Sequence, residues 1–269
     1  MSKLDPMNEF DDATYVSPNG EGEIRPGWDI GGNANGGYLL SILANAMRQA
    51  SHTADPISLS AHFLAPGSPG PVQATTEVVK AGRRFTTVTG SLRSGTRELV
   101  RALGTFGDVS AEASDVLYDT TRPPDVPPYE ECVERPASNG SVAVALTGRV
   151  SVRLHPDQLG YTVGAKNGVA ELTGWFAFRD GRPLDTLSLL LACDAFPPSV
   201  FNIDLPPGWV PTVTLNVQIR ERPAPGPVQC RFTTRHVANA MFEEDGEVWD
   251  SRGRLVALSR QLALIARAS

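Results

Sequence analysis

The sequence predicts an α+β fold made of two similar halves, each an antiparallel sheet with one helix. Short alternating segments follow one another closely along the 269 residues, as strands joined by hairpins do. The same order, a Gly-Trp pair, then a helix, then a run of strands, also occurs twice, at Gly27-Trp28 and Gly174-Trp175. A helix before a run of strands is typical of α+β folds and not of βαβ units.

The first half is predicted to hold one buried helix and a four-stranded meander. Asn35, Gly36 and Gly37 lead into a helix over 38–50, whose buried stripe is Leu39, Ile42, Leu43 and Ala46. The alternation in ISLSAHFL places Leu59 and Phe63 on one face and His62 on the other. The predicted strands are 57–64, 72–80, 83–93 and 98–107.

The second half repeats this order around a helix predicted over 184–196. Asp185 is placed to accept hydrogen bonds from the first turn, and Pro197 and Pro198 end the helix because proline lacks the N–H that a helix interior needs. The predicted strands are 149–156, 169–180, 212–219, 228–237 and a hairpin over 240–265.

Residues 109–143 are rich in proline and are predicted to be a linker, with structural units over 10–108 and 144–269. A sheet wrapped around one central helix is the hotdog architecture. The sequence therefore predicts a double hotdog, with two antiparallel sheets each wrapped around a helix and paired edge to edge. Such a fold does not by itself define the chemistry.

The composition excludes several classes of function. The net charge is −6, and no cluster of Lys and Arg indicates nucleic-acid binding. No apolar run reaches the roughly 20 residues of a membrane helix. The first residues lack the apolar core of a secretory signal, so we expect a cytoplasmic protein. The three cysteines, Cys132, Cys193 and Cys230, show no metal or redox spacing and are expected to be reduced.

Asp194 is the anomalous residue of the second predicted helix. It continues the apolar stripe of Leu187, Leu190 and Leu191, and it lies near the C-terminal end, where the helix dipole disfavours a negative charge. The pattern leaves two readings open. Asp194 either points to solvent from the helix end or meets a polar group arranged to receive it.

The order and spacing of several segments resemble the acyl-CoA thioesterase II (TesB-like) family over nearly the whole chain outside the linker and the first residues. These are WDIGGNANGGYLLSILA and the strands that follow it, then LLLACDAFPP, TVTLNVQI and GRLVALSRQLALI. The resemblance implies hydrolysis of acyl-CoA thioesters without metal or cofactor. It also implies that an Asp, a Thr and a Gln hold the attacking water, at Asp194, Thr214 and Gln261. The family often has an Asp-His pair after the Thr, where this chain has Asn216 and Val217.

The same three residues suit this chemistry on physical grounds. A buried carboxylate has a raised pKa and can act as a base, and a hydroxyl and an amide can bind a water together with it. The strand alternation places Thr214 away from the apolar side of its strand, and Gln261 is an amide in an otherwise apolar strand. A purely structural role stays open for both residues, because threonine is common in any strand and Gln261 could be a polar residue of an edge strand.

A second group of candidates lies in the first half. The amides of Asn35, Gly36 and Gly37 open a helix and could polarise a thioester carbonyl, or the glycines could only allow close packing. His62 on a polar strand face could reach a substrate, and Arg84 could bind the phosphates of CoA. A surface histidine and a solvated arginine are the alternatives.

Three functions therefore follow from the sequence. The first is an acyl-CoA thioesterase, which could assemble as a homo-oligomer. The second, motivated by Asn216, is a hotdog protein that binds acyl-CoA or an acyl carrier with little turnover. The third is an enoyl-CoA hydratase, which is disfavoured because the nearest Asp and His, His52 and Asp55, precede a strand instead of opening the central helix.

Overall fold

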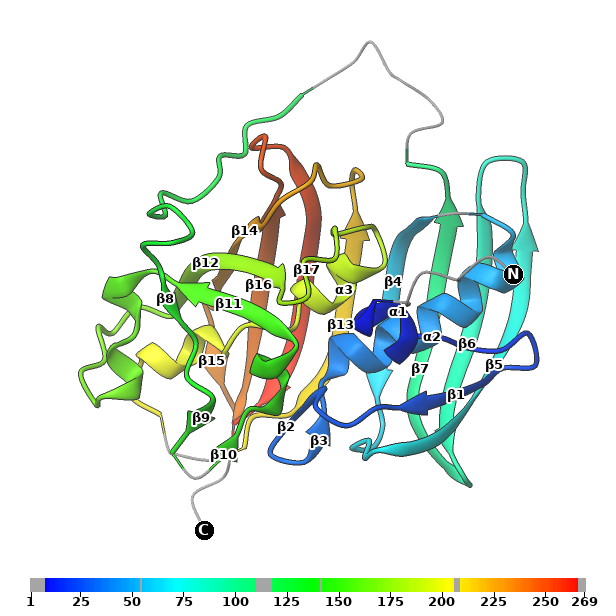
Figure 1. Ribbon diagram of the computed structural model, residues 1–269, viewed down its shortest axis with the longest axis horizontal. Helices are drawn as coiled ribbons and strands as arrows, with labels where there is room; N and C mark the ends of the chain where they lie inside the picture. Colours follow the sequence, from blue (N-terminus) through cyan, green and yellow to red (C-terminus); the bar gives the residue numbers. More distant parts are fainter. Residues whose placement is uncertain (1–7, 54, 110–117, 141, 206–208, 266–269) are drawn as a thin grey trace, which may run out of the picture.

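The computed structural model describes residues 8–53, 55–109, 118–140, 142–205 and 209–265. One antiparallel sheet of 13 strands runs through both halves (Figure 1). The first half supplies, in order across the sheet, β1 (Glu21–Ile24), β5 (Gly70–Ala81), β6 (Thr86–Ser94), β7 (Arg97–Gly107) and β4 (Asp55–Phe63). The second half continues with β13 (Thr212–Ile219), β17 (Leu255–Leu264), β16 (Met241–Trp249), β14 (Val228–Thr233), β12 (Glu171–Phe178), β11 (Val150–Leu154) and β8 (Val133–Glu134), with β15 (Val237–Ala238) beside β16.

The α+β class and the antiparallel strands agree with the sequence prediction, and the two predicted sheets pair edge to edge, as expected, into one continuous sheet. The two halves join where β4 pairs with β13, with Ala61 opposite Leu215 and Leu59 opposite Val217. These four side chains are buried because the alternating apolar residues of both strands point to the same face of the sheet. The join therefore belongs to the hydrophobic core.

The helix of the first half, α2 (Gly36–Ser51), starts two residues before its predicted start at Tyr38. Asn35 caps it, since its side-chain oxygen accepts a hydrogen bond from the amide of Tyr38 at 2.9 Å. The buried face of α2 carries Leu39, Ile42, Leu43 and Met47 and packs against β4, β5, β6 and β7. The helix thus covers the sheet of its own half, as predicted.

The predicted helix over 184–196 is wrong in length, because α3 spans only Ser188–Ala192. Asp185 accepts a hydrogen bond from the first turn as predicted, from the amide of Ser188 to its Oδ1 at 2.8 Å, although the residue at the cap position is Leu187. At the other end, the carbonyls of Asp194 and Ala195 accept hydrogen bonds from the side chains of Asn35 and Arg135. These two carbonyls lie after the last helical residue, Ala192, and are bound by side chains that are remote in sequence.

The segment predicted as a linker contributes secondary structure and side chains to the second half. It contains β8, β9 (Ser138–Asn139) and β10 (Val142–Ala143), and the last two pair as a hairpin. A second small hairpin, β2 (Asp29–Ile30) with β3 (Asn33–Ala34), precedes α2. In Figure 1 both hairpins lie on the lower side of the molecule, below the start of α2.

Short helices complete the fold. They are α1 (Glu9–Ala13) and four 3₁₀ turns, η1 (Ala145–Gly148), η2 (Pro156–Gln158), η3 (Gly160–Thr162) and η4 (Ser199–Asn202). The ring of Phe10 in α1 lies 5.9 Å from that of Trp28 and 5.0 Å from that of Phe178, which belongs to β12. The N-terminal helix therefore packs against both halves.

Candidate active site

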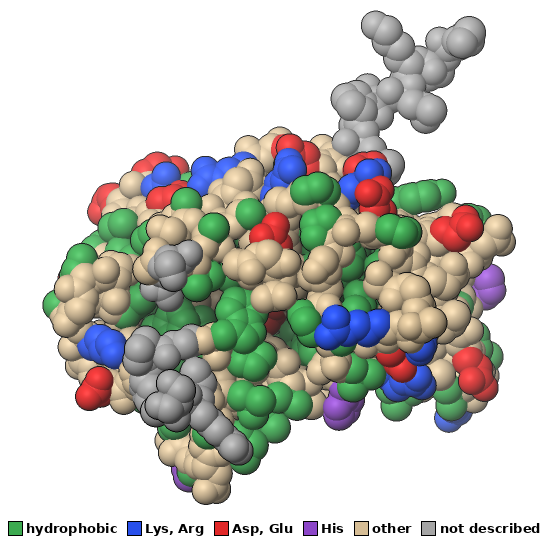
Figure 2. Space-filling model, turned by 90° about the horizontal axis from the view of Figure 1, so that it is seen from below, with side chains coloured by type: hydrophobic (Ala, Val, Ile, Leu, Met, Phe, Trp, Pro, Cys, Tyr) green, Lys and Arg blue, Asp and Glu red, His purple; other side chains and the backbone are tan. Residues whose placement is uncertain are grey.

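A cavity of about 570 Å³ lies where the start of α2 meets the end of α3. Its walls are mostly apolar and come from both halves and from the segment before β11. They include Ile30, Leu39, Phe63, Val144, Phe196 and Trp209. The polar side chains in the walls are Asn33, Asn35, Arg135, Asp194, Thr212 and Gln261. Figure 2, which views the side of the two small hairpins, shows hydrophobic side chains gathered across the middle of this face.

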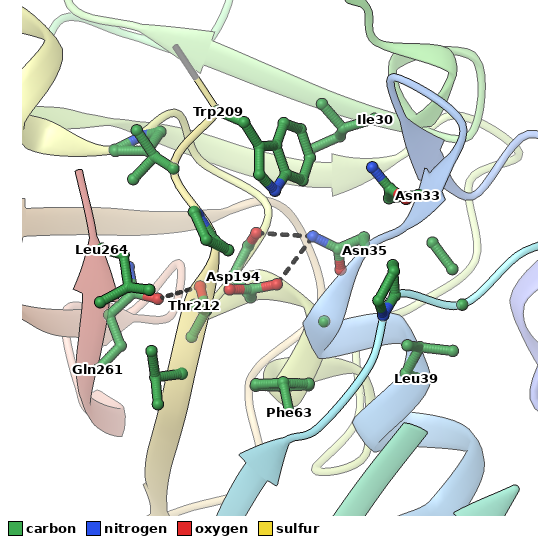
Figure 3. A pocket seen from close by; sticks show the side chains of 18 of the residues that line it. Ile30, Asn33, Asn35, Leu39, Phe63, Asp194, Trp209, Thr212, Gln261 and Leu264 are labelled. Atoms are coloured by element: carbon green, nitrogen blue, oxygen red, sulfur yellow. Dashed lines mark hydrogen bonds between the residues drawn. The ribbon is translucent and has the colours of Figure 1, made fainter. Parts of the chain in front are cut away.

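Asp194 lies at this meeting point and is held through one of its two oxygens (Figure 3). Oδ2 accepts hydrogen bonds from Asn35 Nδ2 at 2.9 Å and from the amide of Gly37 at 2.8 Å. No hydrogen bond from the described residues ends on Oδ1, and Oδ1 is not sealed from the cavity. The carboxylate is therefore fixed on one side and open on the other.

Burial raises the pKa of Asp194 to about 6. The amide of Gly37, the side chain of Asn35 and the amide of Gly36 oppose this rise, as does the positive charge of Arg135. The N-terminus of α2 has the positive end of the helix dipole, which also favours a nearby anion. The negative charge of Asp194, which was anomalous in the sequence, is thus stabilised by the N-terminus of α2.

Gly36 and Gly37 allow this contact because neither has a side chain. A Cβ on Gly37 would lie 2.7 Å from the carbonyl oxygen of Leu190 and 2.9 Å from the Cβ of Asp194. A Cβ on Gly36 would lie 3.0 Å from Asp194 Oδ2. The sequence left close packing and hydrogen bonding as alternatives for this turn. The structure combines them, with the Gly37 amide bound to Asp194 and not open to a substrate carbonyl.

Gln261 belongs to a hydrogen-bonded chain that starts at a buried carboxylate. Its Nε2 donates to Glu244 Oε1 at 2.6 Å, and its Oε1 accepts from the hydroxyl of Thr212 at 2.9 Å. Glu244 also accepts from the amide of Ser199 at 2.6 Å, and burial raises its pKa. Figure 3 shows Thr212 and Gln261 on one side of Asp194 and Asn35 on the other.

Thr214, the threonine expected at the site, does not line the cavity, whereas Thr212 does. The register of β13 against β17 shifts between the two threonines, so that Thr212 opposes Ala263 while Thr214 opposes Leu262. Such a bulge reverses the alternation of faces. Leu262 is 37% exposed and Ala263 is buried, so Thr214 lies on the outer face and Thr212 on the inner one.

The other candidates also lie away from the cavity. His62 opposes Thr214 in β4 and is exposed on the outer face, and Asn216 is exposed on that face too. Arg84 precedes β6, whose start aligns with the start of β4, whereas the cavity lies beyond the end of β4. Neither His62 nor Arg84 is among the side chains that the structure places at the site.

Two residues of the cavity region were missed in the sequence. Glu244 sits in the run FEEDGE, where alternation alone does not distinguish a buried carboxylate from exposed neighbours. Arg135 lies in the proline-rich segment, which has no periodic pattern. Both positions depend on tertiary packing.

A second buried carboxylate, Asp55 at the start of β4, lies beside the residues that precede α3. Asp55 accepts hydrogen bonds from the hydroxyl of Thr186 at 2.8 Å and from the amide of Val109 at 3.2 Å. Arg222 binds both of its oxygens, at 3.3 and 2.9 Å. Asp55 is 3% exposed and does not line the large cavity.

Among the described residues no group of three or more His, Cys, Asp or Glu side chains is placed to hold a metal ion. The three cysteines are buried and free. No helix in the described ranges is long and apolar enough to cross a membrane.

Comparison with known proteins identifies the class and then the family. Residues 24–107 match the family model of the acyl-CoA thioesterase N-terminal domain, and residues 125–265 match that of the C-terminal domain. The fold and the match define the class as that of the hotdog-fold thioesterase proteins. The chain belongs to the acyl-CoA thioesterase family, as the resemblance in the sequence predicted.

Several relatives share nearly the full length of the chain. A Thermobifida fusca YX structure, described as that of a proposed thioesterase II, is 34% identical, with a TM-score of 0.86 over 97% of this chain and 99% of that one. The acyl-CoA thioesterase II TesB2 of Mycobacterium marinum shares the fold, with 16% identity, a TM-score of 0.61 and coverage of 87% and 90%. An uncharacterized Mycobacterium tuberculosis (H37Rv) protein is 29% identical, covering 91% of this chain and 90% of its own length.

Proposed function

We propose that the protein hydrolyses acyl-CoA to a free acid and CoA, with a water held by Asp194, Thr212 and Gln261. The environment of Asp194 is the main support for this proposal. One oxygen is fixed by two donors and the other is open to an apolar cavity. With a pKa raised to about 6, the carboxylate is a stronger base than an exposed aspartate and is still ionised at neutral pH.

The direction of the hydrogen bonds in the Glu244 chain supports a defined water orientation. Gln261 donates to Glu244, so its oxygen is left to accept the hydroxyl proton of Thr212. The lone pairs of Thr212 are then free to accept a hydrogen bond from water. A water that donates one proton to Thr212 and the other to Asp194 Oδ1 turns a lone pair toward the thioester.

The chemical step follows from this geometry. The water oxygen attacks the thioester carbon while Asp194 takes one proton, and the carbonyl becomes a tetrahedral oxyanion. The carbon–sulfur bond then breaks, the proton passes to the sulfur, and the acid and the CoA thiol are released. Holding base and water in place supplies the part of the rate enhancement that comes from proximity.

The test is thiol release by the purified full chain from acyl-CoAs of two to sixteen carbons. We expect hydrolysis of part of this panel well above background. Asp194→Asn keeps the shape of the side chain but removes the base, so we expect a loss of about 1000-fold or more in kcat/KM. Its melting temperature should not fall, because the amide avoids the cost of a buried charge. No hydrolysis by the wild type, or a loss below about tenfold in the variant, would refute the proposal.

A binding protein with little turnover was the alternative that Asn216 motivated. Asn216 is exposed on the outer face of the sheet, whereas the candidate site lies on the inner face. The departure from the family pattern therefore lies away from the reacting groups, and we give preference to the hydrolase. Tight binding of acyl-CoA without hydrolysis in the same assay would favour the alternative.

A further inference from the structure

Arg135 places a cation in the wall of the cavity. The residue follows β8, and it is only 8% exposed although it lines the large cavity. Its Nη1 donates to the carbonyl oxygen of Ala195 at 2.5 Å, beside Asp194. This bond anchors the guanidinium close to the candidate catalytic carboxylate without using its other donors.

The remaining donors of Arg135 have no protein partner in the described ranges. No carboxylate there forms an ion pair with it, and neither Nε nor Nη2 finds an acceptor. Neither atom is sealed from solvent, and Arg135 lines both the large cavity and a smaller neighbouring pocket that Tyr161 also lines. By contrast, the side chain of Arg182 is 7% exposed and binds two carboxylates, those of Asp11 and Asp185.

The described groups around Arg135 do not accept hydrogen bonds from its Nε or Nη2. Asp194 interacts with it only through its charge, and its Oδ2 is held by Asn35 and Gly37. Tyr161, which lines the smaller pocket with Arg135, contributes a charge interaction, and no hydrogen bond in the described ranges joins it to the guanidinium. The rest of the nearby wall is apolar, including Val144, Phe196 and Phe201. A hydrocarbon chain in this cavity would leave a desolvated cation without a partner, which is costly.

We infer that this cavity selects acyl-CoAs whose acyl group ends in a carboxylate, bound by the Nε–Nη2 edge of Arg135. The inference rests on the proposed thioesterase function and names its substrate class. The Nε–Nη2 edge matches the two oxygens of a carboxylate, a geometry in which arginine forms two parallel hydrogen bonds. The phosphates of CoA fit this position less well, because they are large and strongly hydrated and Arg135 is buried.

The experiment compares substrate pairs of equal chain length, adipoyl-CoA with hexanoyl-CoA and glutaryl-CoA with pentanoyl-CoA. We expect the wild type to prefer the carboxylated member of at least one pair by about tenfold or more in kcat/KM, the effect of one charge-assisted interaction. Arg135→Met should abolish this preference, and Arg135→Lys should retain part of it. The ratio within each pair cancels any general loss caused by the missing bond to Ala195.

Three results would overturn the inference. The wild type could hydrolyse the uncharged member of both pairs as well as the charged one, a result that needs no variant. Arg135→Met could lower both members equally, which is the outcome of a structural role. It could instead raise KM equally for both, which is the outcome of binding to CoA phosphates.

A binding measurement separates this inference from the proposed function. Non-hydrolysable CoA thioethers with a five-carbon chain ending in a carboxylate or in a methyl group are titrated by calorimetry into wild type and Arg135→Met. A preference for the carboxylate that is lost in the variant supports the role of Arg135 even if no acyl-CoA is hydrolysed. Equal affinities in the wild type refute it even if hydrolysis occurs.

Discussion

Two buried carboxylates lie near the two ends of α3, one after the helix and one beside the residues before it, and their environments differ. After the helix, Asp194 is bound by neutral donors on a single oxygen and faces a cavity. Before it, Asp55 is bound on both oxygens by Arg222 and also by Thr186. A carboxylate whose acceptors are filled by a cation stabilises the fold, whereas one with an open oxygen is available for chemistry.

The largest expected contrast comes from the same substitution at both positions. Asp194→Asn should lower kcat/KM by about 1000-fold, while Asp55→Asn should leave it within about threefold. Asp55→Asn should instead lower the free energy of unfolding by about 2 kcal/mol, since it removes hydrogen bonds to a charged group. Urea unfolding and thiol release measure the two effects. Comparable activity losses in both variants would show that the two carboxylates do not differ in role.

The second prediction concerns the bulge that brings Thr212 to the inner face. Thr212→Val keeps the branched shape but removes the hydroxyl, and we expect kcat/KM to fall by about 100-fold, as for loss of an oriented polar contact in an active site. Thr214→Val is the matched control on the outer face and should change activity by less than about twofold. A larger loss of kcat/KM in Thr214→Val than in Thr212→Val would instead assign the water-binding hydroxyl to Thr214.

These two threonines also show which features of the fold and the site can be predicted from the sequence. Alternation correctly located the strands, including β4 and β13, because the burial of every second residue leaves a periodic pattern. Thr214 was chosen through the family resemblance, and alternation rightly put it away from the apolar face; the bulge that brings Thr212 to the wall of the cavity has no sequence signal of its own. The predicted helix over 184–196 was too long, and the residues just after its observed end at Ala192 are bound by the side chains of Asn35 and Arg135, which are remote in sequence.

A smaller effect is expected at Glu244, which fixes the orientation of the Gln261 amide. In Glu244→Gln, the new amide can either accept from Gln261 or donate to it. The Gln261 amide is then no longer held in one orientation, and its oxygen no longer always faces the hydroxyl of Thr212. We expect kcat to fall about tenfold with little change in KM, equal to roughly 1.4 kcal/mol in the barrier. Glu243→Gln, at the next position of the strand, is the control. A rise in KM with unchanged kcat would contradict a role in orienting the water.

The smallest effect is a shift of the pH profile. The active form of Asp194 is ionised, so kcat/KM should rise with pH and level off above about 6. Asn35→Asp keeps the helix cap but replaces a donor to Oδ2 with a second negative charge, which raises the pKa of Asp194 further. We expect the inflection to move up by about one pH unit, with activity recovering near pH 8. An unchanged or lowered inflection would exclude this role of Asn35.

The join of β4 to β13 within one chain has a consequence for how the two halves can diverge. In a dimer of identical subunits, every substitution at one position appears at its symmetry mate as well. A single chain is free of this constraint. It can keep an open acid at Asp194 after α3 and bind Asp55, before the same helix, with an arginine, so that the first position is available for reactivity and the second for stability.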